Sequence, residues 1–161
     1  ADRPEARLGA PRVSPPLVPL MTLEVAVDTP VTVDPGPPGR RFIPIVGGTV
    51  AGGLEGRVLP GGGDWQTVWD DGRTDISAHY ILDIAGHGTV EILSEGVRAR
   101  PPEVQAALER GEAVDPGLTY FRTSIRMRTS APGLQRLNAV LALAVGERLA
   151  DRVRLTVHEI G

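Results

Sequence analysis

Residues 47–66 read GGTVAGGLEGRVLPGGGDWQ, and this stretch is the most informative part of the sequence about the fold. It contains eight glycines, separated by branched apolar residues of the kind that favour strands. Glycine is costly inside regular structure, so this density indicates bends, bulges or the close approach of a neighbouring backbone or a ligand. The stretch ends in Asp64 and Trp65, an acid beside one of the few large aromatic residues of the chain. We therefore predict bent strands here, and the wall of a binding cavity at Asp64 and Trp65.

Outward from this stretch, the chain repeats a pattern of short strands separated by turns. Glycine (20) and proline (15) punctuate β-prone runs at regular intervals, which is typical of all-β proteins. We predict two short helical stretches, 101–112 and 130–139, and nine strands, over residues 17–27, 40–50, 54–60, 64–70, 75–84, 89–97, 118–129, 140–149 and 152–160. This spacing predicts a single small antiparallel β-barrel of about eight or nine strands, because closure removes exposed sheet edges. A sandwich is the alternative.

Length and charge limit the class of protein. A chain of 161 residues fits one domain, and we predict a flexible Pro- and Arg-rich tail at 1–17 before a barrel at 18–161. The net charge of −3 gives no footprint for nucleic acid, and no apolar run approaches the roughly 18 residues of a membrane span. We expect partners of neither kind. A cytoplasmic location is expected, or a secreted or periplasmic one if a signal peptide was removed before Ala1.

Several kinds of chemistry are excluded by residue type. The chain has no cysteine and no lysine, which removes thiol nucleophiles, disulfides and Schiff-base chemistry. The histidines, His79, His87 and His158, form no metal-binding motif. No sequence typical of a nucleotide-binding loop or a hydrolase nucleophile elbow is present. We expect no metal and no cofactor.

Five segments together resemble a known family of small bacterial and fungal proteins. They are GRRFIPIVGGTVAGG (39–53), GRVLPGGGDWQ (56–66), AHYILDIAGHG (78–88), TYFRTSIRMRT (119–129) and RLNAVLALAVGER (136–148). In order, spacing and length these segments resemble the family of domain of unknown function 3237, also called UPF 0311, from about Leu20 to Ile160. The resemblance implies a single β-barrel without a settled biochemical function. Allene oxide cyclases, dirigent proteins and cofactor-free cyclases are barrels of similar shape, a likeness of fold alone.

Two positions depart from what the family leads us to expect. His79 stands where an arginine is common before the tyrosine, and the segment SIRMRTS after Arg122 lacks the usual proline and aromatic residues. If the family motif binds a ligand, these departures imply altered selectivity.

Asp64 and Tyr80 are the first candidate catalytic residues. Asp64 in an apolar cavity would have a raised pKa and could serve as a general base or hydrogen-bond anchor, with Trp65 as a flat wall for the ligand. Alternatively, Asp64 caps a turn and Trp65 is an ordinary core residue. Alternation in 75–83 places Tyr80 on one face with Ile76, Ala78 and Leu82. If that face lines the barrel, Tyr80 supplies a proton or hydrogen bond; otherwise its hydroxyl simply bonds a backbone carbonyl.

Arg122 is the third candidate catalytic residue. It lies on an Arg-rich face of the strand 118–129 and could bind a carboxylate, enolate or phosphate if that face points inward. Pointing outward, the same face is a solvated stripe or an oligomer contact. Glu147 has the parity of Leu141, Leu143 and Val145, the expected core face of its strand. It could pair with Arg122 or serve as a second acid to Asp64, although its place at a strand end also fits simple exposure. The predicted substrate-binding residues are Trp65, Trp69, Tyr120, Phe121 and Glu147.

Three functions fit such a barrel. The first is a cofactor-independent isomerase, cyclase or lyase that uses acid–base catalysis on a hydrophobic carbonyl or polyketide-like small molecule. The second is a lipocalin-like carrier of a small apolar ligand. The third is a structural module, such as a homodimer or other homo-oligomer, with a packed lumen. A void with several converging ionisable groups would favour the enzyme, a purely apolar void the carrier, and no void the module.

Overall fold

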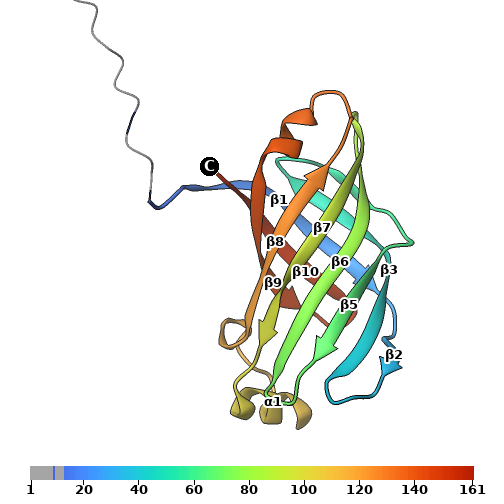
Figure 1. Ribbon diagram of the computed structural model, residues 1–161, viewed down its shortest axis with the longest axis vertical. Helices are drawn as coiled ribbons and strands as arrows, with labels where there is room; N and C mark the ends of the chain where they lie inside the picture. Colours follow the sequence, from blue (N-terminus) through green and yellow to red (C-terminus); the bar gives the residue numbers. More distant parts are fainter. Residues whose placement is uncertain (1–8, 10–12) are drawn as a thin grey trace, which may run out of the picture.

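The computed structural model describes residue 9 and residues 13–161 of the chain. The described part folds into a closed antiparallel β-barrel of eight strands, with two additional strands and one α-helix (Figure 1). The strands are β1 (Leu17–Val27), β2 (Val31–Asp34), β3 (Gly39–Gly52), β4 (Gly56–Val58), β5 (Gly63–Val68), β6 (Arg73–Ile84), β7 (Gly88–Ala99), β8 (Tyr120–Arg128), β9 (Leu141–Arg148) and β10 (Arg152–Ile160). The helices are α1 (Pro102–Glu109) and the short 3₁₀ helices η1 (Pro116–Leu118) and η2 (Gln135–Ala139).

Neighbouring strands follow one another around the barrel in the order β1-β10-β9-β8-β7-β6, then β4 and β5, then β3. The pairing of β3 with β1 closes the ring. This confirms the predicted barrel and not the sandwich. All nine predicted strands are present; β2 was missed, because it is short and all four of its residues are exposed. The predicted tail at 1–17 falls mostly outside the described residues.

The glycines of 47–66 let neighbouring backbones approach closely. A Cβ on Gly48 would overlap the carbonyl oxygen of Glu24 on β1, and one on Gly56 would overlap that of Asp83 on β6. Both glycines lie where β3 leaves β5 and pairs with β4 at a corner of the barrel. The bends predicted from this stretch are therefore present, and at these two positions the close neighbour is another strand.

The barrel interior is packed at one end and hollow at the other. At the end covered by η2, the core contains large buried side chains such as Leu82, Ile92, Met127 and Leu137. The opposite end carries α1, at the bottom of Figure 1, and there the inward side chains border an open cavity. Each of the long strands β6, β7 and β8 contributes to both halves, so the cavity is built on the same strands as the core.

Strand β9 is oriented opposite to the expectation. Its inward positions are the small residues Ala142, Ala144 and Gly146, whereas Leu141, Leu143 and Val145 are exposed. A Cβ on Gly146 would overlap the ring of Phe121. The space that large β9 side chains would need is thus already occupied by an aromatic ring from β8.

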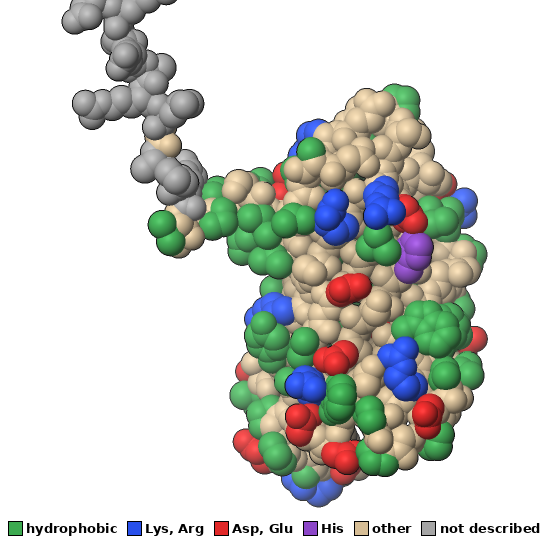
Figure 2. Space-filling model, in the orientation of Figure 1, with side chains coloured by type: hydrophobic (Ala, Val, Ile, Leu, Met, Phe, Trp, Pro, Cys, Tyr) green, Lys and Arg blue, Asp and Glu red, His purple; other side chains and the backbone are tan. Residues whose placement is uncertain are grey.

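The outer surface of the barrel carries charged side chains of both signs among apolar ones, as Figure 2 shows for one face. Within the described residues, no helix has the length and hydropathy that crossing a bilayer would require.

Candidate functional site

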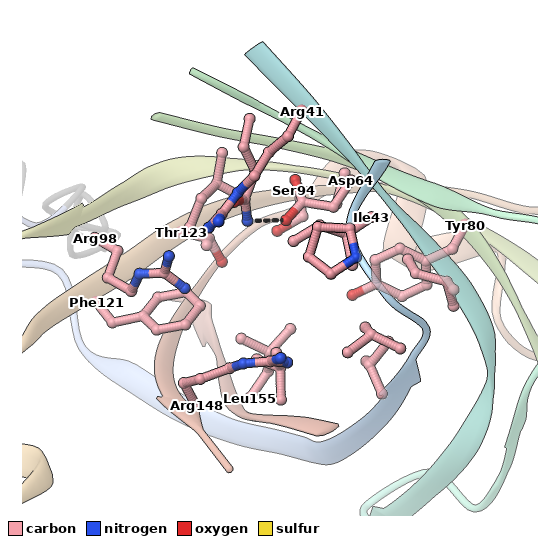
Figure 3. Close-up of a pocket in the computed structure, with 18 of the residues that line it drawn as sticks. Arg41, Ile43, Asp64, Tyr80, Ser94, Arg98, Phe121, Thr123, Arg148 and Leu155 are labelled. Atoms are coloured by element: carbon pink, nitrogen blue, oxygen red, sulfur yellow. Dashed lines mark hydrogen bonds between the residues drawn. The ribbon is translucent and has the colours of Figure 1, made fainter. Parts of the chain in front are cut away.

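The hollow half of the barrel contains a cavity of about 240 Å³. This volume is close to the roughly 300 Å³ lower end of small-molecule pockets, so it suits a compact ligand. Apolar side chains form much of its wall, and polar and charged groups enter it from several sides (Figure 3). The lining residues are Val25, Val27, Pro30, Arg41, Ile43, Ile45, Asp64, Gln66, Ile76, Ala78, Tyr80, Ser94, Arg98, Arg100, Phe121, Thr123, Arg148, Val153 and Leu155.

Asp64 is the only carboxylate among these lining residues. It lies on β5 opposite Ile43 of β3. Its Oδ2 accepts a hydrogen bond of 2.6 Å from Nε2 of the buried Gln66, while its buried Oδ1 has no hydrogen-bond partner among the described residues. Burial raises the pKa of Asp64 to about 6, although the bond from Gln66, an interaction with the Ser77 backbone and the nearby charges of Arg98 and Arg41 act in the opposite direction. A carboxyl group with this pKa can exchange a proton near neutrality.

Tyr80 lies on β6 and points into the same cavity. Its side chain is 2% exposed, and its hydroxyl has no hydrogen-bond partner among the described residues. The backbone-carbonyl partner of the alternative interpretation is therefore absent. Figure 3 shows this hydroxyl pointing into the open space that Arg98 and Arg148 border from other sides. Burial, and then the negative charge of Asp64, raise the pKa of Tyr80, so the phenol stays protonated and can donate.

Four arginines complete the polar part of the lining: Arg41 of β3, Arg98 of β7, Arg100 just after β7, and Arg148 of β9. We call them the arginine cluster. Arg98 is only 9% exposed. Burial, and then the charges of Arg100, Arg41 and Arg148, lower its pKa to about 10, while the charge of Asp64 acts in the opposite direction.

The arginine cluster was not predicted from the sequence, although the alternation of inward and outward residues indicates two of its members. Arg41 is in phase with the buried Ile43 and Ile45 on its strand, and Arg98 with Ile92 and Ser94. A charged residue that keeps the parity of core positions at the end of a strand points into the mouth of a barrel. The predicted anion-binding residue, Arg122, was instead chosen from the most Arg-rich strand.

The predicted aromatic residues divide between the lumen and the outer surface. Phe121 lines the cavity. Trp65 is 46% exposed and packs on Phe42 outside the lining, at a centroid distance of 4.8 Å. Trp69 donates a hydrogen bond of 2.8 Å to Asp75, and Tyr120 is exposed. Neither lines the cavity.

Arg122 and Glu147 also lie outside this cavity. Arg122 is exposed on the outer face of β8, where its guanidinium donates to the carbonyl of Phe121 and lies over the ring of Tyr120. Arg122 was predicted to bind an anion only if this face of the strand pointed inward, and it points outward. Glu147 lies in an adjoining groove with Arg100 and Arg148, and its carboxylate is 3.9 Å from Arg154. The structure thus brings together Asp64, Tyr80 and Phe121 from the predicted set.

The two departures from the family pattern do not line the cavity either. His79 is on the outer face of β6, 2.6 Å from the carboxylate of Glu91. In the SIRMRTS segment, the inward side chains Ile125 and Met127 belong to the packed half of the barrel. Neither departure touches the space where a ligand would lie. The described residues contain no group of three potential metal-binding side chains.

Comparison with known proteins assigns the chain to a family. The family model described as "protein of unknown function (DUF3237)" matches residues 15–160, and the chain belongs to this family. A UPF0311 protein of Bradyrhizobium diazoefficiens is 40% identical over 121 residues, which is 75% of this chain and 80% of the relative. The crystal structure of a conserved protein of unknown function from Rhodopseudomonas palustris is 34% identical, with a TM-score of 0.82 over 92% of this chain and 98% of that one.

A more distant structural neighbour is described as an enzyme from Penicillium herquei. It is 20% identical and has a TM-score of 0.71 over 96% of this chain and 100% of that one. At this identity the likeness shows a shared fold alone.

Proposed function

We propose that the barrel binds a small carbonyl compound in its lumen and catalyses a cofactor-independent isomerisation, cyclisation or elimination by acid–base chemistry. The observation that carries this proposal is that one cavity is lined by two residues with a buried polar atom that has no hydrogen-bond partner. These atoms are Oδ1 of Asp64 and the hydroxyl oxygen of Tyr80. Leaving buried polar groups unpaired costs about 1–3 kcal/mol each. Such groups are retained where a ligand supplies the missing partner.

The roles of the two groups follow from their protonation. Asp64, with a pKa of about 6, is ionised above that pH and accepts a proton from the carbon next to the carbonyl. Tyr80 donates a hydrogen bond to the carbonyl oxygen, where negative charge develops as the proton leaves. Protonated Asp64 then returns the proton, which leaves the enzyme unchanged. The proton goes to the same or another carbon in an isomerisation and to the departing group in an elimination. In a cyclisation the carbanion adds to a second carbonyl of the substrate, and the proton goes to the alkoxide oxygen that this addition forms. The apolar wall excludes water and strengthens these electrostatic interactions.

The carrier and module alternatives have less support. A packed module does not account for a cavity of about 240 Å³, and a carrier of apolar ligands does not account for the ionisable groups that converge on it. A distant barrel described as an enzyme is consistent with catalysis in this fold.

The test measures proton abstraction without knowledge of the natural substrate. Phenylacetone, a compact hydrophobic ketone, is incubated with the protein in D₂O, and loss of the proton signal next to the carbonyl is followed by NMR. We expect exchange above the buffer rate, abolished in Asp64→Asn and reduced at least about tenfold in Tyr80→Phe. Asp83→Asn is the matched control, since Asp83 is an outward carboxylate of β6 paired with Arg57. Equal exchange by Asp64→Asn and the unaltered protein would refute the proposal.

A further inference from the structure

No carboxylate of the described residues forms an ion pair with the arginine cluster, although Asp64 lines the same cavity. Among the described residues, Arg98, Arg100 and Arg148 form no ion pair within 4.0 Å. The fourth member, Arg41, donates from Nε to the neutral amide oxygen of Gln66 at 2.7 Å. Nε of Arg100 is buried without a hydrogen-bond partner. The lining therefore contains four guanidinium groups and a single carboxylate.

This arrangement opposes folding in the absence of a ligand. Arg98, the buried member, loses its hydration without an ion-pair partner, while Arg41 and Arg100 are half-buried and Arg148 is exposed at the rim. The cluster members also repel one another: the charges of Arg100, Arg41 and Arg148 each lower the pKa of Arg98. The strands place them together nonetheless, because Arg98 and Arg148 keep the inward parity of β7 and β9. A site that concentrates like charges in a cavity is built to be completed by the opposite charge.

Guanidinium groups are well suited to one kind of opposite charge. Their planar fork of donors matches the oxygens of a carboxylate or a phosphate, and their hydration is weaker than that of an ammonium group. Arg98 and Arg148 border the open space with Phe121, the Tyr80 hydroxyl faces them across it, and Arg41 lies nearer Asp64 (Figure 3). Much of the remaining wall is apolar, with side chains such as Ile43, Ile45 and Leu155.

We propose that the ligand is a compact organic oxyanion, whose carboxylate or phosphate group binds the arginine cluster while its apolar part extends toward Asp64 and Tyr80. This inference rests on the proposed function for the role of those last two residues, but the oxyanion site itself stands on the unpaired guanidinium groups. In this proposal the arginine cluster binds the anion, in place of Arg122. The expected ligand is then amphipathic, with a single charged end, and no longer purely hydrophobic.

Negative charge formed during the reaction would be stabilised by the same cluster. When Asp64 removes a proton, the substrate becomes more negative, and Arg98 is close enough to Asp64 for the two charges to affect each other's pKa. Fixed positive charges near a developing anion lower the barrier to its formation. The cluster therefore serves binding and, in the same position, the chemical step.

Calorimetric titration of the full chain with three matched probes tests the inference. Phenylacetate, phenyl phosphate and phenylacetamide share an aromatic ring and differ in charge. We expect one or both anions to bind at least about tenfold more tightly than the neutral amide, because charge-assisted hydrogen bonds are roughly twice as strong as neutral ones. The tighter anion identifies the head group. Absence of an anion preference, including absence of binding by all three probes, overturns the inference.

Matched variants locate the site. Arg98→Met should abolish the anion preference, and Arg126→Met, at an exposed position on the outer face of β8, should preserve it. Arg148→Gln, at an exposed position on the rim of the cavity, should reduce anion affinity several-fold without disturbing the core, which covers the case that Arg98→Met does not fold. Unchanged preference in Arg148→Gln and in folded Arg98→Met would place anion binding elsewhere and overturn the inference.

Asp64→Asn separates this inference from the proposed function. It removes the only negative charge among the lining residues, so anion binding should be retained or strengthened while proton exchange is lost. Asp64-dependent exchange with no anion preference would overturn the oxyanion site alone. Selective anion binding with no exchange would overturn the catalytic proposal alone.

Discussion

Asp64 occupies a position where ionisation of the side chain opposes folding. Its pKa rises from 3.8 to about 6 because burial disfavours the charged form. Between these two values the folded chain binds more protons than the unfolded chain, so the free energy of unfolding falls as the pH rises through this window. A shift of about two pKa units corresponds to roughly 3 kcal/mol of stability, present below about pH 4 and lost above about pH 6.

Asp64→Asn should therefore change stability in a pH-dependent way. Asparagine cannot ionise and retains an oxygen that can accept the bond from Gln66. We expect its melting temperature, relative to that of the unaltered protein, to be higher at about pH 8 than at about pH 4. Thermal denaturation followed by circular dichroism at both pH values measures this. A difference that is the same at both pH values would mean that Asp64 titrates normally in the folded chain.

Among individual residues, the sequence predicted those whose orientation follows from alternation along a strand or from a neighbouring turn. Tyr80 follows from alternation with Ile76, Ala78 and Leu82, and Asp64 from its place at the end of a glycine-rich turn. Trp65, beside Asp64, points outward for the same reason that Asp64 points inward, since successive strand residues face opposite sides. Assigning both neighbours to one cavity was therefore wrong.

Strands β8 and β9 show what alternation leaves undetermined. Each has two clear faces, yet periodicity does not say which face is inside. On β8 the apolar face is inside and the arginines outside. On β9 the larger apolar residues are outside, because interiors of small barrels combine large and small side chains to fill the available width and Phe121 supplies the large one. Such complementarity between strands is a property of the assembled barrel.

Gly146→Ala tests this complementarity. A Cβ at this position would overlap the ring of Phe121, so the ring must shift within the cavity wall, at a cost of about 1–3 kcal/mol. Gly39→Ala is the matched control, since a Cβ there lies 3.4 Å from the carbonyl oxygen of Pro35, an ordinary contact. Urea denaturation should show a clearly larger loss for Gly146→Ala. Similar losses for the two variants would argue that Phe121 is not held against β9.

For the molecule as a whole, the sequence predicted the closed barrel and nearly all of its strands, because turn residues and strand residues alternate clearly along the chain. It did not predict that the lumen is filled at one end only. That division depends on which element fills each end of the lumen: Leu137 of η2 packs into one end, whereas Phe121 of β8 borders the cavity at the other. It also decides which inward residues are core and which are site.

The two halves should differ in local stability. In the hollow half, strands have fewer buried apolar neighbours, so local opening there costs less free energy. Hydrogen–deuterium exchange resolved along β6 should be faster over 74–78, beside the cavity, than over 80–84, which includes the core residues Leu82 and Ile84. Strand β7 pairs with both segments, whereas on the other side β5 pairs with the first and β4 with the second, so the comparison uses amides that bond β7. Uniform exchange along β6 would contradict the prediction.

A barrel filled at one end and open at the other also has an evolutionary consequence. The side chains that stabilise the fold and the side chains that would meet a ligand occupy separate lengths of the same strands. Substitutions around the mouth can then change which molecule is accepted while the packed end continues to direct folding. Relatives that keep this architecture can then differ around the mouth without changes to their cores.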